Sequence, residues 1–557
     1  MTEAKYPLLQ IRDLTIDFAV NKAWIPAVRG IDLDLAQGEV LALVGESGSG
    51  KSTLAMSVPG LLADNARLKG SIRLAGQELA GADEGTLNAV RGGKVGVVFQ
   101  EPMTAFNPVY TIGWQIIEAI RMHRDVSEAQ ARSRAIELLE LVDMPDPAAR
   151  MDYYPHQLSG GQRQRAMIAQ ALACDPVLLI ADEPTTALDV TVQAEILDLL
   201  RDLRARVDAA ILLITHAMGV VADLADRIMV MKDGAVVESA SATTLFNDPQ
   251  HPYTRALLAA VPHLGAGRLR VSDVEPAPEP AAPVAALSFR NATIEFKSGP
   301  KKTFRAVDSV DLEVAAGEVV GLVGESGSGK STLGKAAVGL VRLTSGTVTL
   351  AGTDITTLSQ RGLREPRKKV GVIFQDPGSS LNPRWPIGQA IAEPLALHTG
   401  LSASQRASRV DELLEQVQLD RSLRNRYPHQ LSGGQRQRIG IARALALNPA
   451  LVIADEPTSA LDVSVQARVL RLLREIQAEH GFACLFISHD LAVVEELSDR
   501  IAVMQSGGLV ESGPAEAVLH NPTEPYTARL IAAVPVPDPA EQARRREERL
   551  AAARATG

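Results

Sequence analysis

Hydrophobic residues along this chain gather in short continuous runs instead of alternating with polar residues. Such runs occur at Val40 to Val44, Val177 to Ala181 and Ile211 to Thr215. Because they lack the period-two pattern of a half-exposed strand, they are typical of strands buried on both faces of a sheet. Helix-compatible stretches separate the runs, so the pattern predicts an α/β core whose sheet is covered by helices.

The segment between Gln100 and Leu158 has a different pattern. Strand-like runs are missing there, and apolar residues recur with helical spacing around Trp114 to Met122 and Ala131 to Leu141. We therefore expect a helical insertion in the α/β core, at about residues 101–158.

The whole plan occurs twice. GESGSGKSTL begins at Gly45 and again at Gly324, and YPHQLSGGQRQR begins at Tyr154 and again at Tyr427. The copies are collinear with an offset of about 275 residues, far longer than a solenoid repeat, which indicates a duplicated domain. We place the two domains at residues 1–263 and 287–537, the second with a helical insertion at about 376–431.

Two segments lie outside the repeated part. EPAPEPAAP runs from Glu275 to Pro283, and its prolines prevent a helix, so we expect an extended linker at residues 264–286. The last residues, 538–557, are charged and rich in alanine, with a basic run at Arg544 to Arg546. A helical but solvated tail is the expectation for such a segment.

Composition excludes several classes of protein. The chain of 557 residues is too long for one core, and a net charge of −9 gives no overall field that would attract nucleic acid. The two cysteines, Cys174 and Cys484, are too few for a disulfide framework or a four-thiolate zinc site, and they favour a reducing compartment. We expect no membrane span and no secretion signal, since no apolar stretch approaches ~18 to 20 residues.

A glycine-rich loop follows the first buried run of each half. The pattern G-x-x-x-x-G-K-[ST] occurs at Gly45 to Ser52 and at Gly324 to Ser331. Glycines let the backbone wrap phosphates, the helix N-terminus supplies a positive field, lysine reaches the terminal phosphates and serine ligates Mg²⁺. A glycine-rich turn with an exposed lysine is the alternative for a single match. The predicted nucleotide-binding residues of these loops are Gly45, Ser47, Gly48, Ser49, Gly50, Lys51, Ser52 and Thr53, and Gly324, Ser326, Gly327, Ser328, Gly329, Lys330, Ser331 and Thr332.

Adjacent carboxylates end a later buried run in both halves, at Asp182-Glu183 and Asp455-Glu456. Carboxylates at the end of a buried strand are costly unless they hold a cation or take part in chemistry. The aspartate is placed to help hold Mg²⁺, and the glutamate to orient or deprotonate an attacking water. A strand that simply ends in a polar turn is the alternative.

A histidine follows the next apolar run at the same spacing in both halves, as His216 and His489. A single histidine there would be assigned a structural role. Because the placement is repeated, we expect these side chains to donate a hydrogen bond to the terminal phosphate.

Two further repeated motifs resemble those of a known family. LSGGQ at Leu158 to Gln162 and at Leu431 to Gln435 resembles the signature of ATP-binding cassette (ABC) ATPases, and the ALD triplets at Ala187 and Ala460 fit the same family. The resemblance implies tandem P-loop NTPase domains, each with a RecA-like α/β core, an antiparallel β subdomain and a helical insertion. It adds Gln100 and Gln375 as ligands of nucleotide and metal.

The resemblance also implies head-to-tail composite sites, in which the signature of one half closes on the nucleotide of the other. It assigns catalysis to Glu183, His216, Glu456 and His489. It assigns Mg²⁺ to Ser52, Gln100, Asp182, Ser331, Gln375 and Asp455. It adds as nucleotide contacts Ser159, Gly160, Gly161 and Gln162, and Ser432, Gly433, Gly434 and Gln435. Phe18 and Phe296 are the aligned candidates for stacking on adenine, although either can be a core residue.

One local departure distinguishes the two halves. His489 is followed by Asp490, the usual residue of the family, whereas His216 is followed by Ala217. Aspartate caps a following helix and alanine does not, a difference worth about 0.5 to 2 kcal/mol. We expect two hydrolytic sites that differ locally at this position.

The ends of the halves resemble one branch of the family. HPYTRALLAAVP begins at His251 and EPYTARLIAAVP begins at Glu524. These segments resemble the ATPases of oligopeptide, dipeptide and nickel importers. Some of those relatives hold an iron-sulfur cluster on cysteines beyond this segment, and since this chain has none there, we expect no such cluster.

The resemblance implies two integral-membrane permease subunits, an extracytoplasmic solute-binding protein and a peripheral location on the cytoplasmic face of the cell (inner) membrane. It implies no nucleic acid and no covalent anchor. An importer ATPase for peptides is the main hypothesis. An importer of another solute, such as nickel, glutathione or a sugar, is the first alternative. Soluble tandem cassettes acting on ribosomes are another, disfavoured by the short Pro/Ala-rich linker, and DNA-repair cassettes carry zinc cysteines that are missing here.

Overall fold

The computed structural model describes residues 7–186, 188–265, 267–269, 285–297, 303–459 and 461–556. The chain divides into two compact units. Unit 1 contains Met1–Leu188, Val192–Val261 and Pro535–Gly557, and unit 2 contains Asp189–Thr191 and Pro262–Val534. Most of the expected linker, including its Pro/Ala run, lies outside the described residues.

The centre of unit 1 is a six-stranded sheet in the order β10-β9-β3-β8-β7-β6. All neighbours pair in parallel except β10, which is antiparallel to β9. The three runs expected to be buried strands are confirmed, and every residue of β3, β7 and β8 is buried. The strands are β3 (Val40–Val44), β6 (Val95–Val98), β7 (Leu178–Asp182), β8 (Ala210–Ile214), β9 (Arg227–Lys232) and β10 (Ala235–Ser241).

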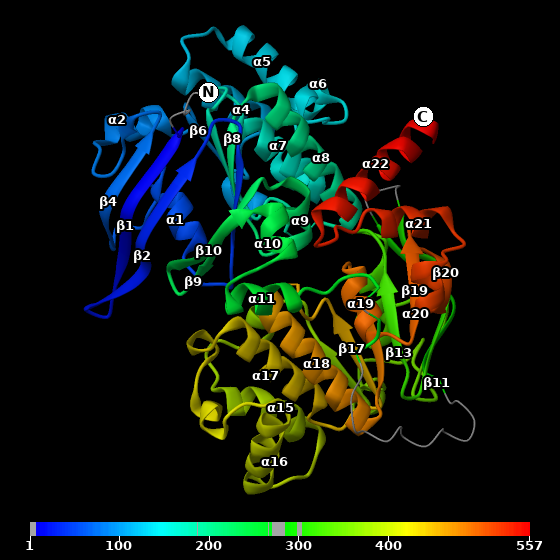
Figure 1. Cartoon of the computed structure of the whole chain (residues 1–557). Coiled ribbons are helices and arrows are strands. Elements are labelled where there is room, and N and C mark those ends of the chain that lie inside the picture. The colour runs from blue at the N-terminus through cyan, green and yellow to red at the C-terminus, as the bar shows by residue number, and fades with distance from the viewer. Residues whose placement is uncertain are drawn as a thin grey trace. The chain divides into compact units, whose positions relative to one another are not determined.

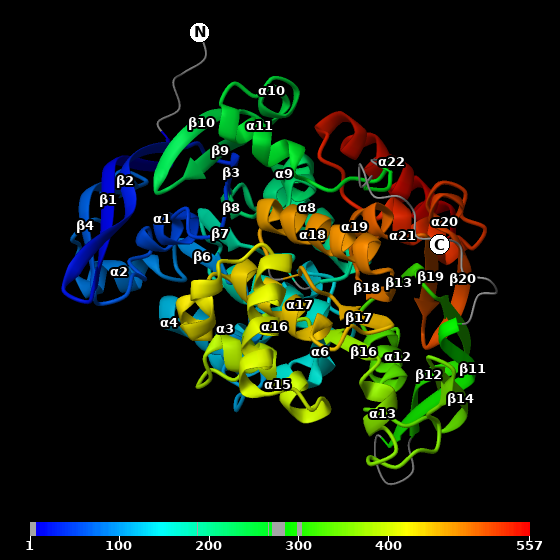
Figure 2. The same cartoon turned by 90° about the horizontal axis from the view of Figure 1, so that it is seen from below.

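A second, antiparallel sheet of four strands has the order β2-β1-β4-β5. Its strands are β1 (Leu9–Val20), β2 (Ala23–Leu35), β4 (Ala66–Leu74) and β5 (Gln77–Glu78). Helix α1 (Lys51–Ser57) lies beside this sheet in both views (Figures 1 and 2). The apolar faces of the two sheets share one hydrophobic cluster, which includes Leu41, Leu43 and Leu54.

Between β6 and β7 the chain is helical, as the spacing of its apolar residues predicts. Residues such as Ile116, Ala135 and Leu138 are fully buried in this segment. Its helices are α3 (Pro102–Ala105), α4 (Ile112–His123), α5 (Glu128–Leu141), α6 (Pro147–Arg150), the short 3-10 helix η1 (Pro155–Gln157) and α7 (Gly160–Ala171). The remaining helices of unit 1 are α2 (Glu84–Val90), α8 (Val190–Val207), α9 (Met218–Leu224), α10 (Ala242–Asn247), α11 (Pro252–Ala259) and α22 (Pro539–Thr556).

Unit 2 repeats this architecture. Its sheets have the orders β16-β17-β18-β13-β19-β20 and β12-β11-β14-β15. The strands are β11 (Ala285–Lys297), β12 (Thr303–Ala315), β13 (Val319–Val323), β14 (Ser345–Leu350), β15 (Thr353–Asp354), β16 (Val370–Ile373), β17 (Leu451–Asp455), β18 (Ala483–Ile487), β19 (Arg500–Gln505) and β20 (Gly508–Pro514). The helices are α12 (Lys330–Ala337), α13 (Arg364–Arg367), α14 (Pro377–Ser380), α15 (Ile387–His398), α16 (Ala403–Gln416), η2 (Arg421–Asn425), η3 (Pro428–Gln430), α17 (Gly433–Leu445), α18 (Val463–His480), α19 (Leu491–Leu497), α20 (Ala515–His520) and α21 (Pro525–Ala532).

The final helix, α22, belongs to unit 1 and contacts α9 and α10. The sequence predicts a solvated tail here, and the helical part of that expectation agrees with the structure. Its side chains are solvated only in part, because Arg544 is exposed whereas Gln542 is buried and Arg546 is mostly covered. Within the described part of the chain, no helix is long and apolar enough to cross a membrane.

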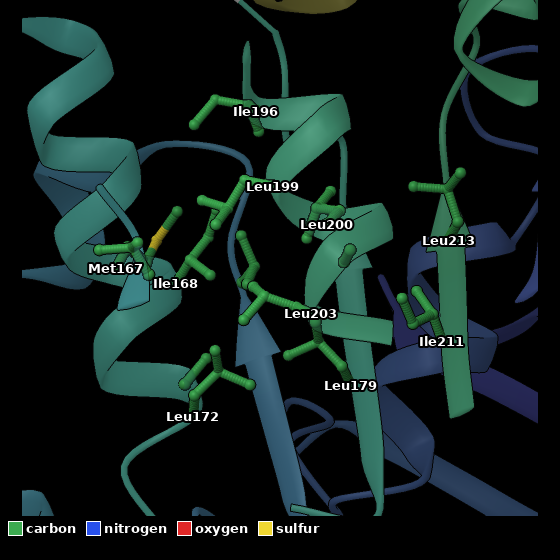
Figure 3. Close-up of a cluster of buried hydrophobic side chains, with 14 of the residues drawn as sticks. Met167, Ile168, Leu172, Leu179, Ile196, Leu199, Leu200, Leu203, Ile211 and Leu213 are labelled. Atoms are coloured by element: carbon green, nitrogen blue, oxygen red, sulfur yellow. The ribbon is translucent and has the colours of Figure 1, made fainter. Parts of the chain in front are cut away.

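The second face of the central sheet in unit 1 packs against α7 and α8 through a cluster of large aliphatic side chains (Figure 3). Ile168 from α7 and Leu172, which directly follows α7, meet Leu200 from α8 in this cluster, together with Leu179 and Leu213 from the strands. Leu200 has no exposed surface. The cluster therefore fixes the two long helices to the strands that carry the polar residues of the site.

Truncation of this cluster is expected to destabilise unit 1. We predict that Leu200→Ala lowers the free energy of unfolding by about 2 to 5 kcal/mol, because a buried side chain is lost and a cavity remains. Denaturant-induced unfolding followed by circular dichroism measures the change. Val109→Ala, at a position with 70% exposure, is the matched control, and an equal effect of both substitutions would contradict the prediction.

Candidate functional site

The glycine-rich loop joins β3 to α1, and its path excludes side chains at two positions. Gly45 has φ +149°, and a Cβ there would lie 2.2 Å from the carbonyl oxygen of Met231. Gly50 has φ +96°, and a Cβ would lie 2.4 Å from the carbonyl oxygen of Ala27. The same close approaches recur at Gly324 and Gly329 in unit 2. Both loops therefore need glycine for a packing reason, in addition to any approach of a ligand.

The lysine at the end of each loop is buried and folded back on the loop. Lys51 Nζ donates to the carbonyl oxygens of Gly45 at 2.9 Å and Glu46 at 2.8 Å. Lys330 does the same in unit 2, at 2.7 Å to Gly324 and 2.7 Å to Glu325. Burial lowers the pKa of Lys330, although nearby carboxylates such as Glu456 oppose the shift. The ammonium groups thus lie inside the loops, where a phosphate would be wrapped by the same backbone.

The serine after each lysine bonds the aspartate at the end of a strand. Ser52 Oγ donates to Asp182 Oδ1 at 3.2 Å, and Ser331 Oγ donates to Asp455 Oδ1 at 2.9 Å. Burial raises the pKa of Asp182 and of Asp455, while the serine hydrogen bonds oppose that shift. A hydroxyl and a carboxylate in contact form an all-oxygen donor set of the kind Mg²⁺ prefers. These residues fit the metal expected from the sequence.

The glutamate that follows the aspartate has an uncommon backbone conformation. Glu183 has φ 48° and Glu456 has φ 45°, in the left-handed region that is costly for a side chain of this size. The backbone N–H of Glu183 donates to Ile214 O at 2.8 Å, and that of Glu456 to Ile487 O at 2.9 Å. A hydrogen bond to the neighbouring strand therefore holds the strained residue at the strand end.

Two side chains from other elements bond the glutamate. Gln100 Nε2 donates to Glu183 Oε2 at 2.7 Å, and His216 Nδ1 lies 3.0 Å from Glu183 Oε1. In unit 2, Gln375 Nε2 lies 2.8 Å from Glu456 Oε2 and His489 Nδ1 lies 3.2 Å from Glu456 Oε1. The structure thus brings together in each unit the lysine, serine, glutamine, carboxylates and histidine that the sequence singled out.

These contacts set the charge of the glutamates. Burial opposes ionisation of Glu183, but the hydrogen bond and charge of His216 outweigh it, so the pKa of Glu183 is lowered. Glu456 and His489 behave in the same way, and the pKa of Glu456 is lowered. Burial likewise opposes protonation of His489, yet pairing with Glu456 raises the pKa of His489. Each glutamate is therefore an ionised group, able to accept a proton.

The signature residues lie at the start of α7 and α17. The Ser159 hydroxyl accepts a hydrogen bond from the N–H of Gln162, and Ser432 accepts one from Gln435. Both serines are exposed. A Cβ on Gly161 would lie 2.6 Å from Val192 Cγ1, so this glycine permits close packing on α8. A role of Ser159 to Gln162 and of Ser432 to Gln435 in binding nucleotide stays a prediction.

The two aromatic residues aligned for adenine stacking differ in their surroundings. Phe18 is half-buried and packs against the hydrophobic cluster shared by the two sheets of unit 1. Phe296 is 44% exposed. Stacking on adenine stays a prediction for both.

A hydroxyl that the motifs do not identify bonds the glutamate of the first half. Thr186 Oγ1 donates to Glu183 Oε2 at 2.9 Å. Its counterpart Ser459 donates instead to the backbone oxygen of Glu456 at 3.2 Å. The Thr/Ser pair three residues after each glutamate was the available signal, since short hydroxyl side chains bond neighbouring groups of a turn.

The expected difference after the histidines is confirmed. Asp490 is the N-cap residue of α19, and its carboxylate accepts from the N–H groups of Ala492 at 3.0 Å and Val493 at 3.3 Å. Ala217 is the N-cap residue of α9 and makes no side-chain cap. Burial raises the pKa of Asp490, while the charge of His489 opposes that shift.

Removal of one charge tests the pair in unit 2. In Glu456→Gln, burial acts on His489 with the charge of Asp490 but without that of Glu456 opposing it, so the pKa of His489 is expected to fall. The pair stabilises unit 2 at pH values between the lowered pKa of Glu456 and the raised pKa of His489, and that stabilisation is lost on either side. NMR titration of ¹⁵N-labelled histidine measures the shift, with the exposed His429 as internal control. An unchanged His489 titration would contradict the pairing.

Comparisons with known proteins identify the family of the chain. The family described as "ABC transporter" matches residues 28–186 and 307–459. The family described as "Oligopeptide/dipeptide transporter, C-terminal region" matches residues 237–285 and 510–557. One solved structure, a dimeric ATP-binding cassette MJ0796 bound to ADP and Pi, is similar at 32% identity and a TM-score of 0.39, covering 41% of this chain and 98% of that chain.

Curated relatives match along nearly the whole chain. The glutathione import ATP-binding protein GsiA of Escherichia coli K12 is 46% identical over 96% of this chain and 90% of the relative. The protein of the same name from Pectobacterium atrosepticum is 45% identical over 96% of this chain and 91% of the relative. The chain therefore belongs to the ABC transporter ATPases, as a tandem ATP-hydrolysing importer subunit whose two halves carry the oligopeptide/dipeptide transporter C-terminal region.

Proposed function

We propose that this chain energises the import of peptide-like solutes, glutathione among them, by hydrolysing ATP at two sites. The observation that carries the proposal is the repeated cluster of an ionised glutamate with a glutamine and a histidine, beside a P-loop, in both halves. The names of the matched relatives and of the matched C-terminal region support the solute class. We propose the domain limits given by the sequence, residues 1–263 and 287–537.

Each site is proposed to use its own residues in the same way. Lys51 binds the terminal phosphates, and Ser52, Gln100 and Asp182 hold Mg²⁺, which neutralises developing charge on the phosphates when bound. The Glu183 carboxylate accepts a proton from the attacking water, and its lowered pKa keeps it ionised for that step. Lys330, Ser331, Gln375, Asp455 and Glu456 have these roles in the second half.

The histidines have a second proposed role. Each has one ring nitrogen on the glutamate, which leaves the other nitrogen to donate to the terminal phosphate. The pair therefore links the base to the phosphate that is released. We further propose that the signature beginning at Ser432 completes the first nucleotide site, and that the one beginning at Ser159 completes the second.

The partners follow from the family and are proposals for this chain. Two integral-membrane permease subunits would use the hydrolysis, and an extracytoplasmic solute-binding protein would deliver the solute. The chain would then be peripheral to the cytoplasmic face of the inner membrane. Dependence of the uptake of nickel, a sugar or another solute class on this chain is an alternative result of the transport test.

Substitution of the bases tests the assignment of catalysis. We predict that Glu183→Gln and Glu456→Gln each lower the turnover of their own site by about 10² to 10⁴-fold, because the amide cannot accept the proton. ATP binding is expected to persist. Phosphate release and nucleotide binding by the purified chain measure the two effects, and hydrolysis at the full rate in the double variant would contradict the role.

A transport assay tests the solute class. Cells that lack the chain are expected to lose uptake of labelled glutathione or short peptides, and the wild-type chain is expected to restore it. The chain carrying both Glu→Gln substitutions should not restore uptake. Purification of the chain with ribosomes and without a membrane partner would overturn the importer assignment.

A further inference from the structure

The helix after the switch histidine is held differently in the two halves. In unit 2, α19 has the Asp490 cap on its first turn. In unit 1, α9 (Met218–Leu224) has Ala217 as its N-cap residue, which makes no side-chain cap. The two helices otherwise occupy the same place in the fold, directly after His489 and His216. An uncapped short helix leaves its first N–H groups without an intrahelical partner.

A residue from the end of the chain packs on the first turn of α9. Gly219 is buried, and a Cβ on it would lie 2.6 Å from Pro535 Cβ and 2.8 Å from the carbonyl oxygen of Pro535. Only glycine leaves room for this contact. The counterpart of Gly219 in α19 is Ala492, which has a side chain. Glycine inside a helix costs roughly 0.5 to 1 kcal/mol relative to alanine, so the contact with Pro535 gives it a structural reason.

Charged residues of α22 fix the same helix further along. The Asp223 side chain in α9 is 1% exposed, and its Oδ1 lies 2.7 Å from Arg201 Nη2 and 3.3 Å from Arg546 Nη1. Arg549 Nη2 lies 2.8 Å from Asp198 Oδ2 in α8. A buried carboxylate needs partners of this kind. Helix α22 therefore supplies part of the charge balance of α8 and α9.

The segment between Pro535 and α22 is itself ordered by hydrogen bonds. Gln542 is buried, and its Oε1 accepts from the backbone N–H of Val536 at 2.9 Å. Asp538 caps α22, with Oδ1 accepting from the N–H groups of Ala540 at 2.8 Å and Glu541 at 3.0 Å. Pro535 and the arginines are thus parts of one ordered element.

Unit 2 has a covering segment on α19 as well, but at the other end of the helix. The N–H of Gly265 donates to Glu495 Oε2 at 2.8 Å, and the N–H of Leu269 donates to the backbone oxygen of Glu496 at 2.9 Å. These contacts lie in the second half of α19, whereas its first turn has the Asp490 cap. The Asp490 cap and these hydrogen bonds thus support α19, whereas Pro535 packs on the first turn of α9.

We propose that residues 535–549 act as an internal clamp that replaces the missing cap of α9 and so positions His216 against Glu183. Pro535, Arg546 and Arg549 are positioning residues, since none of them touches the reacting groups. The proposal rests on the proposed roles of His216 and Glu183. Since the N-cap residue Ala217 directly follows His216, any displacement of the first turn of α9 moves the imidazole relative to a partner that is 3.0 Å away.

The experiment uses the full-length chain with three variants of the clamp. One ends at Pro537, the second combines Arg546→Ala with Arg549→Ala, and the third combines Arg546→Lys with Arg549→Lys. Arg544→Ala is the matched control, because Arg544 is 59% exposed and its ion pairs stay within α22. Thermal unfolding identifies any variant that fails to fold. If the shortened chain does not fold, the double alanine variant is used for the test.

Hydrogen exchange measured by mass spectrometry reports on α9. Exchange in residues 217–224 is expected to be about 2- to 30-fold faster in the shortened and double alanine variants, the range given by loss of a helix cap. Exchange in residues 490–497 should be the same in every variant. Exchange in residues 217–224 should be unchanged in the double lysine variant and in Arg544→Ala. Introduction of Ala217→Asp into the shortened chain should restore slow exchange. Unchanged exchange in residues 217–224 of both the shortened and the double alanine variants would overturn the proposal.

Photolabelling with 8-azido-ATP separates turnover at the first site from binding. Labelling of the first half after trapping by vanadate, which requires hydrolysis, is expected to fall about 2- to 30-fold relative to the second half. Labelling without turnover should stay within about two-fold. Faster exchange in α9 with normal trapping would show a purely structural clamp and overturn the positioning role. Normal trapping in Glu183→Gln would instead contradict the role of Glu183 as the base. The exchange measured in α9 does not depend on that role, so the two failures can be distinguished.

Discussion

Two adjacent carboxylates at the end of a fully buried strand are the constraint around which each half of this protein is organised. Asp182 and Glu183 follow four buried apolar residues of β7, where an unpaired charge would be very costly. Ser52, Gln100 and His216, from three other segments, satisfy them. The P-loop, the neighbouring strand and the segment before the helical insertion are thereby fixed at one edge of the sheet, which is where parallel α/β sheets bind ligands.

The duplication shows which features of this arrangement are required and which vary. Both glutamates have a left-handed backbone, and both bond a glutamine and a histidine. The surroundings differ, because Thr186 bonds the carboxylate of its glutamate whereas Ser459 bonds a backbone oxygen. The helices after the histidines differ more, since one has an aspartate cap and the other is packed against the end of the chain. The cluster of glutamate, glutamine and histidine is the same in both halves, while the contacts that support it differ.

Much of the fold was predictable because its signals are local. Continuous apolar runs identified β3, β7 and β8, and helical spacing identified α4 and α5. The P-loop, the carboxylate pairs and the histidines were identified by their spacing, and their repetition excluded coincidence. The hydrogen bonds among them were not predictable in detail. The choice of Thr186 to bond Glu183 depends on side-chain rotamers and on backbone angles that are set by packing of the whole unit.

Short motifs are enough to identify two P-loop ATPase halves in this chain, because the spacing of each motif reflects one strand, loop or helix. They also show where the halves differ, at Ala217 and Asp490. The left-handed conformation of Glu183 and the place of the last residues in unit 1 depend on packing between distant segments. Pro535 and Gly219 are more than 300 residues apart, and a contact between such distant residues leaves no periodic pattern or local motif, since it exists only when the fold brings them together.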